Sequence, residues 1–102
     1  MHNLTQNEFV EYLGAVYIAK SVKGYLYKNL KLTGHCIEGD RESEKHFKLS
    51  VDELYQAYKD GVRTTTEMRK YISGWKYSPA LAILNMVYQL EAQVKELKKT
   101  EG

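Results

Sequence analysis

The sequence predicts an α+β fold: a small antiparallel sheet with short helices and one long C-terminal helix. Three observations predict this fold class. Helix-start patterns recur ahead of apolar segments, short apolar runs bounded by glycine fill the middle of the chain, and no helix-breaking residue follows position 79 until the final glycine. The length of 102 residues is that of a single domain. Within it we expect an α+β body over 1–77 and a C-terminal helix over 78–102.

The first predicted helix covers residues 6–13. Thr5 and Glu8 have the spacing of a capping box, in which each side chain bonds the backbone N–H of the other residue. Gly14 is expected to end this helix. The apolar run over 15–22 favours a buried strand because it is short, rich in β-branched and aromatic residues, and bounded by glycines. Helix in place of strand remains the alternative for 15–32.

A second strand is expected over 25–32, because three leucines alternate with polar residues there. Leu26, Leu30 and Leu32 would share one face of this strand. Two further segments, 34–38 and 45–49, read as the strands of a β-hairpin. Between them, the polar stretch 39–44 is expected to form a mobile, charged tip.

Two short helices should follow the hairpin. Ser50 and Thr64 are suitable N-caps, and a glutamate stands three residues after each of them. Gly61 and Gly74 are expected to end these two helices.

The C-terminal helix should begin at Ser78, with Pro79 in its first turn. Its first half is apolar nearly all round and is expected to be buried in the body. Apolar residues then continue at alternating spacings of three and four, which is typical of a coiled-coil seam. We therefore predict a parallel homodimer or higher homo-oligomer, with the helix folded back on its own body as the alternative. The predicted interface consists of Ile83, Val87, Leu90, Val94 and Leu97.

Two segments resemble a small domain of uncharacterised phage and prophage proteins. Residues 5–14 are similar to its opening, a short acidic helix that ends in Glu-Tyr-Ile-Gly and leads into a strand. Residues 49–58 are similar to its later helix, of the type Trp-Ser-Pro-x-Glu-Val-Phe, although Val51 stands where that domain has proline and no tryptophan precedes Ser50. The resemblance covers about the first 58 residues. It implies a phage or mobile-element origin and an α+β body, and it carries no active-site residues.

Basic and aromatic residues gather within fifteen positions of the sequence, from 63 to 77. Arginine and lysine attract phosphate, and aromatic rings stack on bases. We therefore predict a non-enzymatic binding protein that occupies either a host protein or an anionic, nucleotide-like ligand. The alternative is a solvated rim with a tryptophan that fills a helix junction. The candidate contact residues are Arg63, Arg69, Lys70, Trp75, Lys76 and Tyr77.

Two other functions compete with ligand binding. The stretch 62–84 has the outline of a helix-turn-helix, so a DNA-binding regulator is the first alternative and nucleic acid an alternative partner. Against it, the presumed reading helix starts with Pro-Ala-Leu-Ala, which offers almost nothing to a base edge. A purely structural oligomer is the second alternative.

Several classes of function find no support in the composition. The hairpin carries His35, Cys36 and His46, but adjacent strand residues point to opposite faces and the close ligand pairs of zinc sites are missing, so we expect no metal and no cofactor. No phosphate-binding glycine loop or nucleophile–base arrangement appears, so we expect no enzyme. A net charge of +2, the single cysteine and the lack of a signal or membrane segment favour the cytoplasm, that of the host cell if the chain is phage-encoded.

Overall fold

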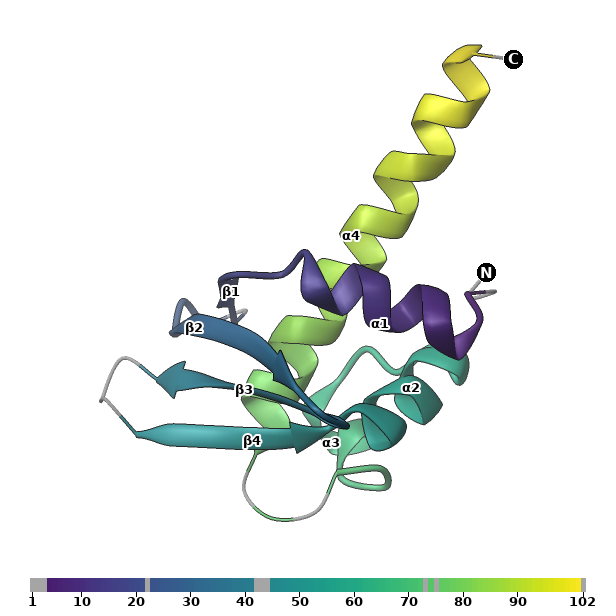
Figure 1. The fold of residues 1–102 in the computed structure, drawn as a ribbon. Coiled ribbons are helices and arrows are strands. Elements are labelled where there is room, and N and C mark those ends of the chain that lie inside the picture. The colour runs from purple at the N-terminus through teal and green to yellow at the C-terminus, as the bar shows by residue number, and fades with distance from the viewer. Residues whose placement is uncertain (1–3, 22, 42–44, 73, 75, 102) are drawn as a thin grey trace.

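The structure is a computed structural model, and it confirms the predicted fold class. It describes residues 4–21, 23–41, 45–72, 74 and 76–101, with only the helical backbone described for 97–101. The elements follow in the order α1 (Gln6–Gly14), β1 (Ala19–Lys20), β2 (Leu26–Thr33), β3 (Cys36–Arg41), β4 (His46–Ser50), α2 (Val51–Lys59), α3 (Thr65–Met68) and α4 (Tyr77–Glu101) (Figure 1).

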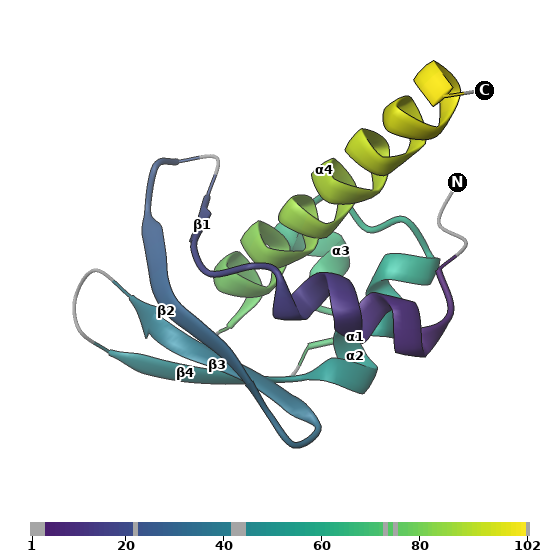
Figure 2. The same ribbon diagram turned by 45° about the horizontal axis from the view of Figure 1, so that its top comes forward.

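The strands form one antiparallel sheet in the order β1-β2-β3-β4, so each strand pairs with its neighbour in the sequence. Figures 1 and 2 show α4 running along one side of this sheet, with α1 and α2 packed beside it. The opposite face of the sheet carries charged and polar side chains, among them Lys48, which is exposed. The apolar core therefore lies between the sheet and the helices.

Helix α1 begins as predicted. The Thr5 hydroxyl accepts a hydrogen bond from the Glu8 N–H, and the Glu8 carboxylate accepts one from the Thr5 N–H, which completes the capping box. The helix includes Gly14 and is capped by Ala15 in a right-handed conformation. The predicted boundary is correct to one residue, although Gly14 does not adopt the left-handed conformation that a glycine stop usually has.

The strand predicted over 15–22 is wrong in length. Among the described residues of this run, only Ala19 and Lys20 form a regular ladder with β2, and the irregular segment before them adds one bond, from the Leu30 N–H to the Tyr17 carbonyl oxygen. The alternative of helix is wrong as well, since α1 ends at Gly14. Val16 and Ala19 are each 2% exposed, whereas Tyr17 and Ile18 are 74% and 48% exposed, so only part of this apolar run is buried. Val22 lies outside the described residues.

Strand β2 has the predicted position but a different buried face. Its pairing with β3 shifts between Lys28 and Lys31, and Asn29 has a left-handed φ of 57°. Such a bulge places one extra residue in the strand and interrupts the two-residue alternation of faces. Tyr27 and Leu30 are therefore both buried, whereas Leu26 and Leu32 are only half-buried.

The predicted hairpin is present, but its strands are longer than expected. Gly39 and Asp40 pair with Phe47 and His46, so the first part of the predicted polar tip belongs to β3. The Asp40 carboxylate accepts a hydrogen bond from the Asn29 amide at 2.9 Å and lies 2.9 Å from His46 Nδ1. These two contacts lower the pKa of Asp40. Residues 42–44 of the predicted tip lie outside the described residues.

Helices α2 and α3 start at their predicted caps. The Ser50 hydroxyl accepts a hydrogen bond from the Glu53 N–H, and the Thr64 hydroxyl accepts one from the Glu67 N–H. Helix α2 ends two residues before Gly61, as expected. Helix α3 covers only four residues, so the predicted helix up to Gly74 is wrong in length.

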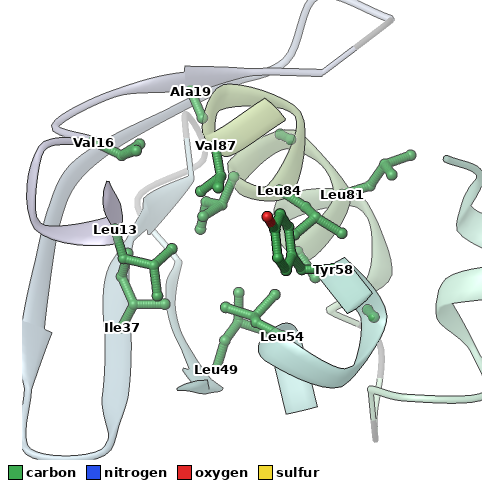
Figure 3. Packing of buried hydrophobic residues seen from close by; sticks show 14 of the residues in the cluster. Leu13, Val16, Ala19, Ile37, Leu49, Leu54, Tyr58, Leu81, Leu84 and Val87 are labelled. Carbon is green, nitrogen blue, oxygen red and sulfur yellow. The ribbon is translucent and has the colours of Figure 1, made fainter. Parts of the chain in front are cut away.

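Helix α4 begins at Tyr77, one residue before its predicted cap. Its first half is buried as predicted, and Figure 3 shows Leu81, Leu84 and Val87 in the core, beside residues of α1, α2 and the sheet. Its second half leaves the body and projects outward in both ribbon views (Figures 1 and 2), so the alternative of a folded-back helix is wrong. Among the described residues, no helix is both long and apolar enough to cross a membrane.

A polar cluster joins the N-terminal segment to α2 and α4. The Tyr58 hydroxyl donates to a Glu91 carboxylate oxygen at 2.7 Å and accepts a hydrogen bond from the Leu4 N–H at 3.0 Å. The Tyr55 hydroxyl donates to the Leu4 carbonyl oxygen at 2.9 Å. Burial raises the pKa of Tyr58, so this hydroxyl stays protonated and remains a donor to the buried Glu91.

Candidate functional site

A pocket of about 500 Å³ opens beside the first turns of α4. This volume lies within the range of small-molecule sites. We call it the inner pocket. It is formed by the turn between β1 and β2, the segment around α3, and one face of α4. Its described lining residues are Ser21, Lys23, Tyr25, Arg63, Thr64, Thr65, Arg69, Tyr77, Ser78, Leu81, Ala82 and Asn85.

The inner pocket combines positive charge with aromatic rings. Lys23, Arg63 and Arg69 supply the charge, and the described residues that line this pocket include no carboxylate. The Arg69 guanidinium lies 5.6 Å from the centre of the Tyr77 ring. Tyr25 is 56% exposed and also lines the pocket, so part of this residue is accessible to a ligand. Such a combination suits an anion that carries a flat ring.

Local hydrogen bonds fix the turn that carries Lys23 and Tyr25. The Ser21 N–H donates to the Tyr25 carbonyl oxygen, and the Tyr25 N–H donates to the Ser21 hydroxyl. The hydroxyl of Ser78, which lines the pocket, lies 2.7 Å from the Tyr27 hydroxyl. This contact joins the part of the pocket wall on α4 to strand β2.

A second pocket, of about 580 Å³, lies next to the first, and we call it the outer pocket. The two pockets share Ser21, Arg63 and Asn85. The other described residues of the outer pocket are Lys20, Tyr88, Gln89 and Ala92.

The position of Arg63 is set by an aromatic contact. Its guanidinium lies 4.2 Å from the centre of the Tyr88 ring, which is close enough for a cation–π interaction. Tyr88 is itself held by a hydrogen bond from its hydroxyl to the Val62 carbonyl oxygen at 2.9 Å. Burial raises the pKa of Tyr88 to about 12, while the Arg63 charge acts in the opposite direction. At neutral pH the hydroxyl therefore remains a donor to Val62.

The acidic side chain nearest in sequence to the inner pocket is Glu67, and it accepts hydrogen bonds at the N-terminal cap of α3. Its Oε1 accepts hydrogen bonds from the Thr64 hydroxyl at 3.0 Å and from the Arg63 N–H at 3.4 Å. Glu67 is not among the described residues that line either pocket. Arg63 thus makes two separate contacts. Its backbone N–H donates to the Glu67 carboxylate, and its guanidinium lies against the Tyr88 ring.

Three of the six predicted contact residues meet at the inner pocket: Arg63, Arg69 and Tyr77. Lys70 is exposed and is not among the lining residues of either pocket. The Lys76 ammonium donates to the Lys48 carbonyl oxygen at 2.6 Å, which directs it to β4. Trp75 lies outside the described residues.

Sequence reasoning did not identify the part of the site contributed by the strands and by the polar face of α4. Lys20, Lys23 and Tyr25 are more than thirty-five positions before Arg63 in the sequence and meet it only because β1 packs against α4. Asn85 and Gln89 interrupt an otherwise apolar or helix-forming stretch at a spacing of four. That spacing places both amides on one helix face and was the available signal.

The outline of a helix-turn-helix over 62–84 does not produce a reading helix. Helix α3 is only four residues long, and the first turns of α4 are buried, with Pro79 and Ala80 inside the core. A recognition helix needs an open face at its N-terminal end to enter the major groove. The burial of these turns therefore argues against this alternative.

The predicted interface of the C-terminal helix needs a correction. Ile83 and Val87 are both 0% exposed in the core of the single chain, so a second copy cannot reach them. Leu90 also packs partly against the core, and Val94 is half-buried. The Leu97 side chain lies outside the described part of the helix. Any self-association is thus restricted to the projecting half of α4.

The hairpin histidines and cysteine take part in no metal cluster. Within the described ranges, no group of three or more histidine, cysteine, aspartate or glutamate side chains is arranged to hold a metal ion. Cys36 is a free thiol and half-buried.

Comparison with known proteins adds no relative. The chain matches no protein-family model, and neither a curated protein nor a solved structure is significantly similar to it. The resemblance of its first 58 residues to a phage domain therefore stays a prediction.

Proposed function

We propose that this chain is a non-enzymatic binding protein of phage or mobile-element type that acts in the cytoplasm and binds an anionic, nucleotide-like ligand in the inner pocket. One observation carries the proposal. Arg63 and Arg69, two of the residues that the sequence predicts for contact, line the same pocket as the exposed Tyr25 ring and the Tyr77 ring. Guanidinium groups bind phosphate through paired hydrogen bonds, and aromatic rings stack on a base.

The pocket supports the small-molecule form of the prediction over the host-protein form. Its lining is concave and cationic and brings hydroxyl groups from Ser21, Thr64 and Ser78 close to the charges. Protein–protein contact favours flatter surfaces, whereas small ligands favour pockets of this size with few convergent polar groups.

Isothermal titration calorimetry with nucleoside 5′-monophosphates tests the proposal. We expect at least one of them to bind the wild-type chain, and adenosine without phosphate to bind much more weakly. Arg69→Gln removes the guanidinium group, which in this proposal donates hydrogen bonds to the phosphate. The substitution should therefore weaken binding by about tenfold or more.

Lys70→Gln is the matched control, because Lys70 is exposed, adjacent in sequence, and not among the lining residues. It removes the same unit of charge and should leave the affinity unchanged. Equal weakening by both variants would show that binding follows net charge and not the pocket. Absence of nucleotide binding to the wild-type chain would overturn the proposal.

We also propose that the projecting half of α4 pairs in parallel with a second copy of the chain. Beyond the buried Glu91, α4 continues for about 15 Å and points away from the sheet and the other helices in both ribbon views. Val94 continues the apolar seam there, and Leu97 follows it in the sequence.

Sedimentation velocity at several concentrations tests the pairing. The wild-type chain should run as a dimer at high concentration, and Val94→Glu should make it monomeric, because the seam would then bury two unpaired carboxylates. Gln93→Glu adds the same charge at the neighbouring exposed position and should not change the assembly. A wild-type chain that stays monomeric at high concentration would contradict the pairing.

A further inference from the structure

The two pockets adjoin along α4 through the three lining residues that they share, and we call the pair of pockets the groove. Residues of α4 that line them recur every three or four positions, so they lie on a single face of the helix. From Tyr77 to Ala92 this face extends over about 22 Å. The series is Tyr77, Ser78, Leu81, Ala82, Asn85, Tyr88, Gln89 and Ala92. A single mononucleotide would leave part of such a groove empty.

Positive charge follows the groove over its length. Arg69 and Lys23 line the inner pocket alone, Lys20 lines the outer pocket alone, and Arg63 lines both. The Arg63 guanidinium lies 4.2 Å from the centre of the Tyr88 ring, a shorter distance than the 5.6 Å between the Arg69 guanidinium and the Tyr77 ring. A positive charge positioned by an aromatic ring therefore lies at the junction of the two pockets.

The two ends of the groove differ in chemistry. The inner pocket offers the rings of Tyr25 and Tyr77, on which a base can stack. The outer pocket offers the side-chain amides of Asn85 and Gln89, which can donate and accept hydrogen bonds at the edge of a base or at a ribose.

We propose that the groove binds two nucleoside units joined by a phosphodiester, with the first base in the inner pocket, the linking phosphate at Arg63 and the second nucleoside in the outer pocket. The proposal rests on the proposed function, because it assumes that the inner pocket takes a nucleotide. Two sources supply this chemistry: a free linear dinucleotide and one end of a single nucleic-acid strand.

The test compares the binding of AMP and of 5′-phosphorylated diadenylate (pApA) by calorimetry. We expect pApA to bind the wild-type chain at least about tenfold more tightly, since it adds one phosphate contact and one nucleoside contact. Gln89→Ala and Lys20→Gln alter only the outer pocket, and both positions are exposed. They should reduce the advantage of pApA while leaving the affinity for AMP unchanged. Arg69→Gln should weaken both ligands.

The outcomes separate the two proposals. Binding of AMP with no gain for pApA would overturn the two-unit groove and leave the proposed function standing. Lack of binding by pApA and by all the nucleoside 5′-monophosphates would overturn both. A gain for pApA that survives Gln89→Ala and Lys20→Gln would place the second unit elsewhere and would also overturn the groove. A ten-residue oligoadenylate that binds no more tightly than pApA would identify the free dinucleotide as the source, and much tighter binding would identify the strand.

Discussion

Leu84→Ala is expected to lower the free energy of unfolding by about 2–5 kcal/mol. Leu84 is 0% exposed and lies on α4 beside Tyr58 of α2 in the centre of the core (Figure 3). Shortening its side chain removes apolar contacts within the core and leaves a cavity that the surrounding side chains cannot fully close. Urea denaturation followed by circular dichroism measures the loss, at a concentration where the chain is a single species.

Gln93→Ala is the matched control on the same helix. Gln93 is exposed on the projecting half of α4, so its replacement by alanine should change the unfolding free energy by no more than about 0.5 kcal/mol. If both alanine variants had the same stability, the division of α4 into a buried and a projecting half would be incorrect.

The helices could be predicted from the sequence because their signals are local. Thr5, Ser50 and Thr64 each bind the N–H three residues later, and the start of each helix follows from the residue types at two positions. The length of α3 could not be predicted in this way. Met68 at the end of α3 and Ile72 after it are both buried, so the segment continues to pack on the core after the regular helix has ended.

The sheet was less predictable because its faces depend on pairing between distant residues. Counting alternate positions assigned Leu26, Leu30 and Leu32 to one buried face, but the bulge at Asn29 shifts the alternation. Whether a bulge forms depends on the partner strand, where Gly39 leaves space for the Leu30 side chain. The residue pattern of one strand alone cannot show that its partner strand leaves this space.

The same distinction between local and long-range signals applies to the candidate site. Arg63, Arg69 and Tyr77 are close in sequence and were found as a cluster, because short-range neighbours stay near one another in any fold. Lys20 and Lys23 join them through the packing of β1 on α4, a long-range contact. Lys76, although adjacent to Tyr77, is directed to Lys48 of β4. Proximity in sequence therefore brought three of the six predicted contact residues to one pocket, and it gave no indication of the opposite wall.

Gly39→Ala is expected to destabilise the fold by about 1–3 kcal/mol. A Cβ at this position would lie 2.4 Å from Leu30 Cδ2, 3.0 Å from the Lys28 carbonyl oxygen and 3.2 Å from Phe47 Cζ. Leu30 and Phe47 are both buried, and the Lys28 oxygen belongs to the backbone of the bulge, so none of the three can move away freely. The measurement is again the urea midpoint, with the slope of the transition as a check on two-state unfolding.

Gly14→Ala supplies the comparison, because it makes the same chemical change at the end of α1. A Cβ there would meet Leu32 Cδ1 at 3.6 Å, an ordinary contact, and the backbone of Gly14 is not left-handed. Alanine lowers the conformational entropy of the unfolded chain, so Gly14→Ala should be neutral or stabilise by up to about 1 kcal/mol. If Gly39→Ala lowers the free energy of unfolding and Gly14→Ala raises it, the loss at Gly39 is explained by the close approach of the bulge. A loss of stability at Gly14 as large as that at Gly39 would contradict this explanation.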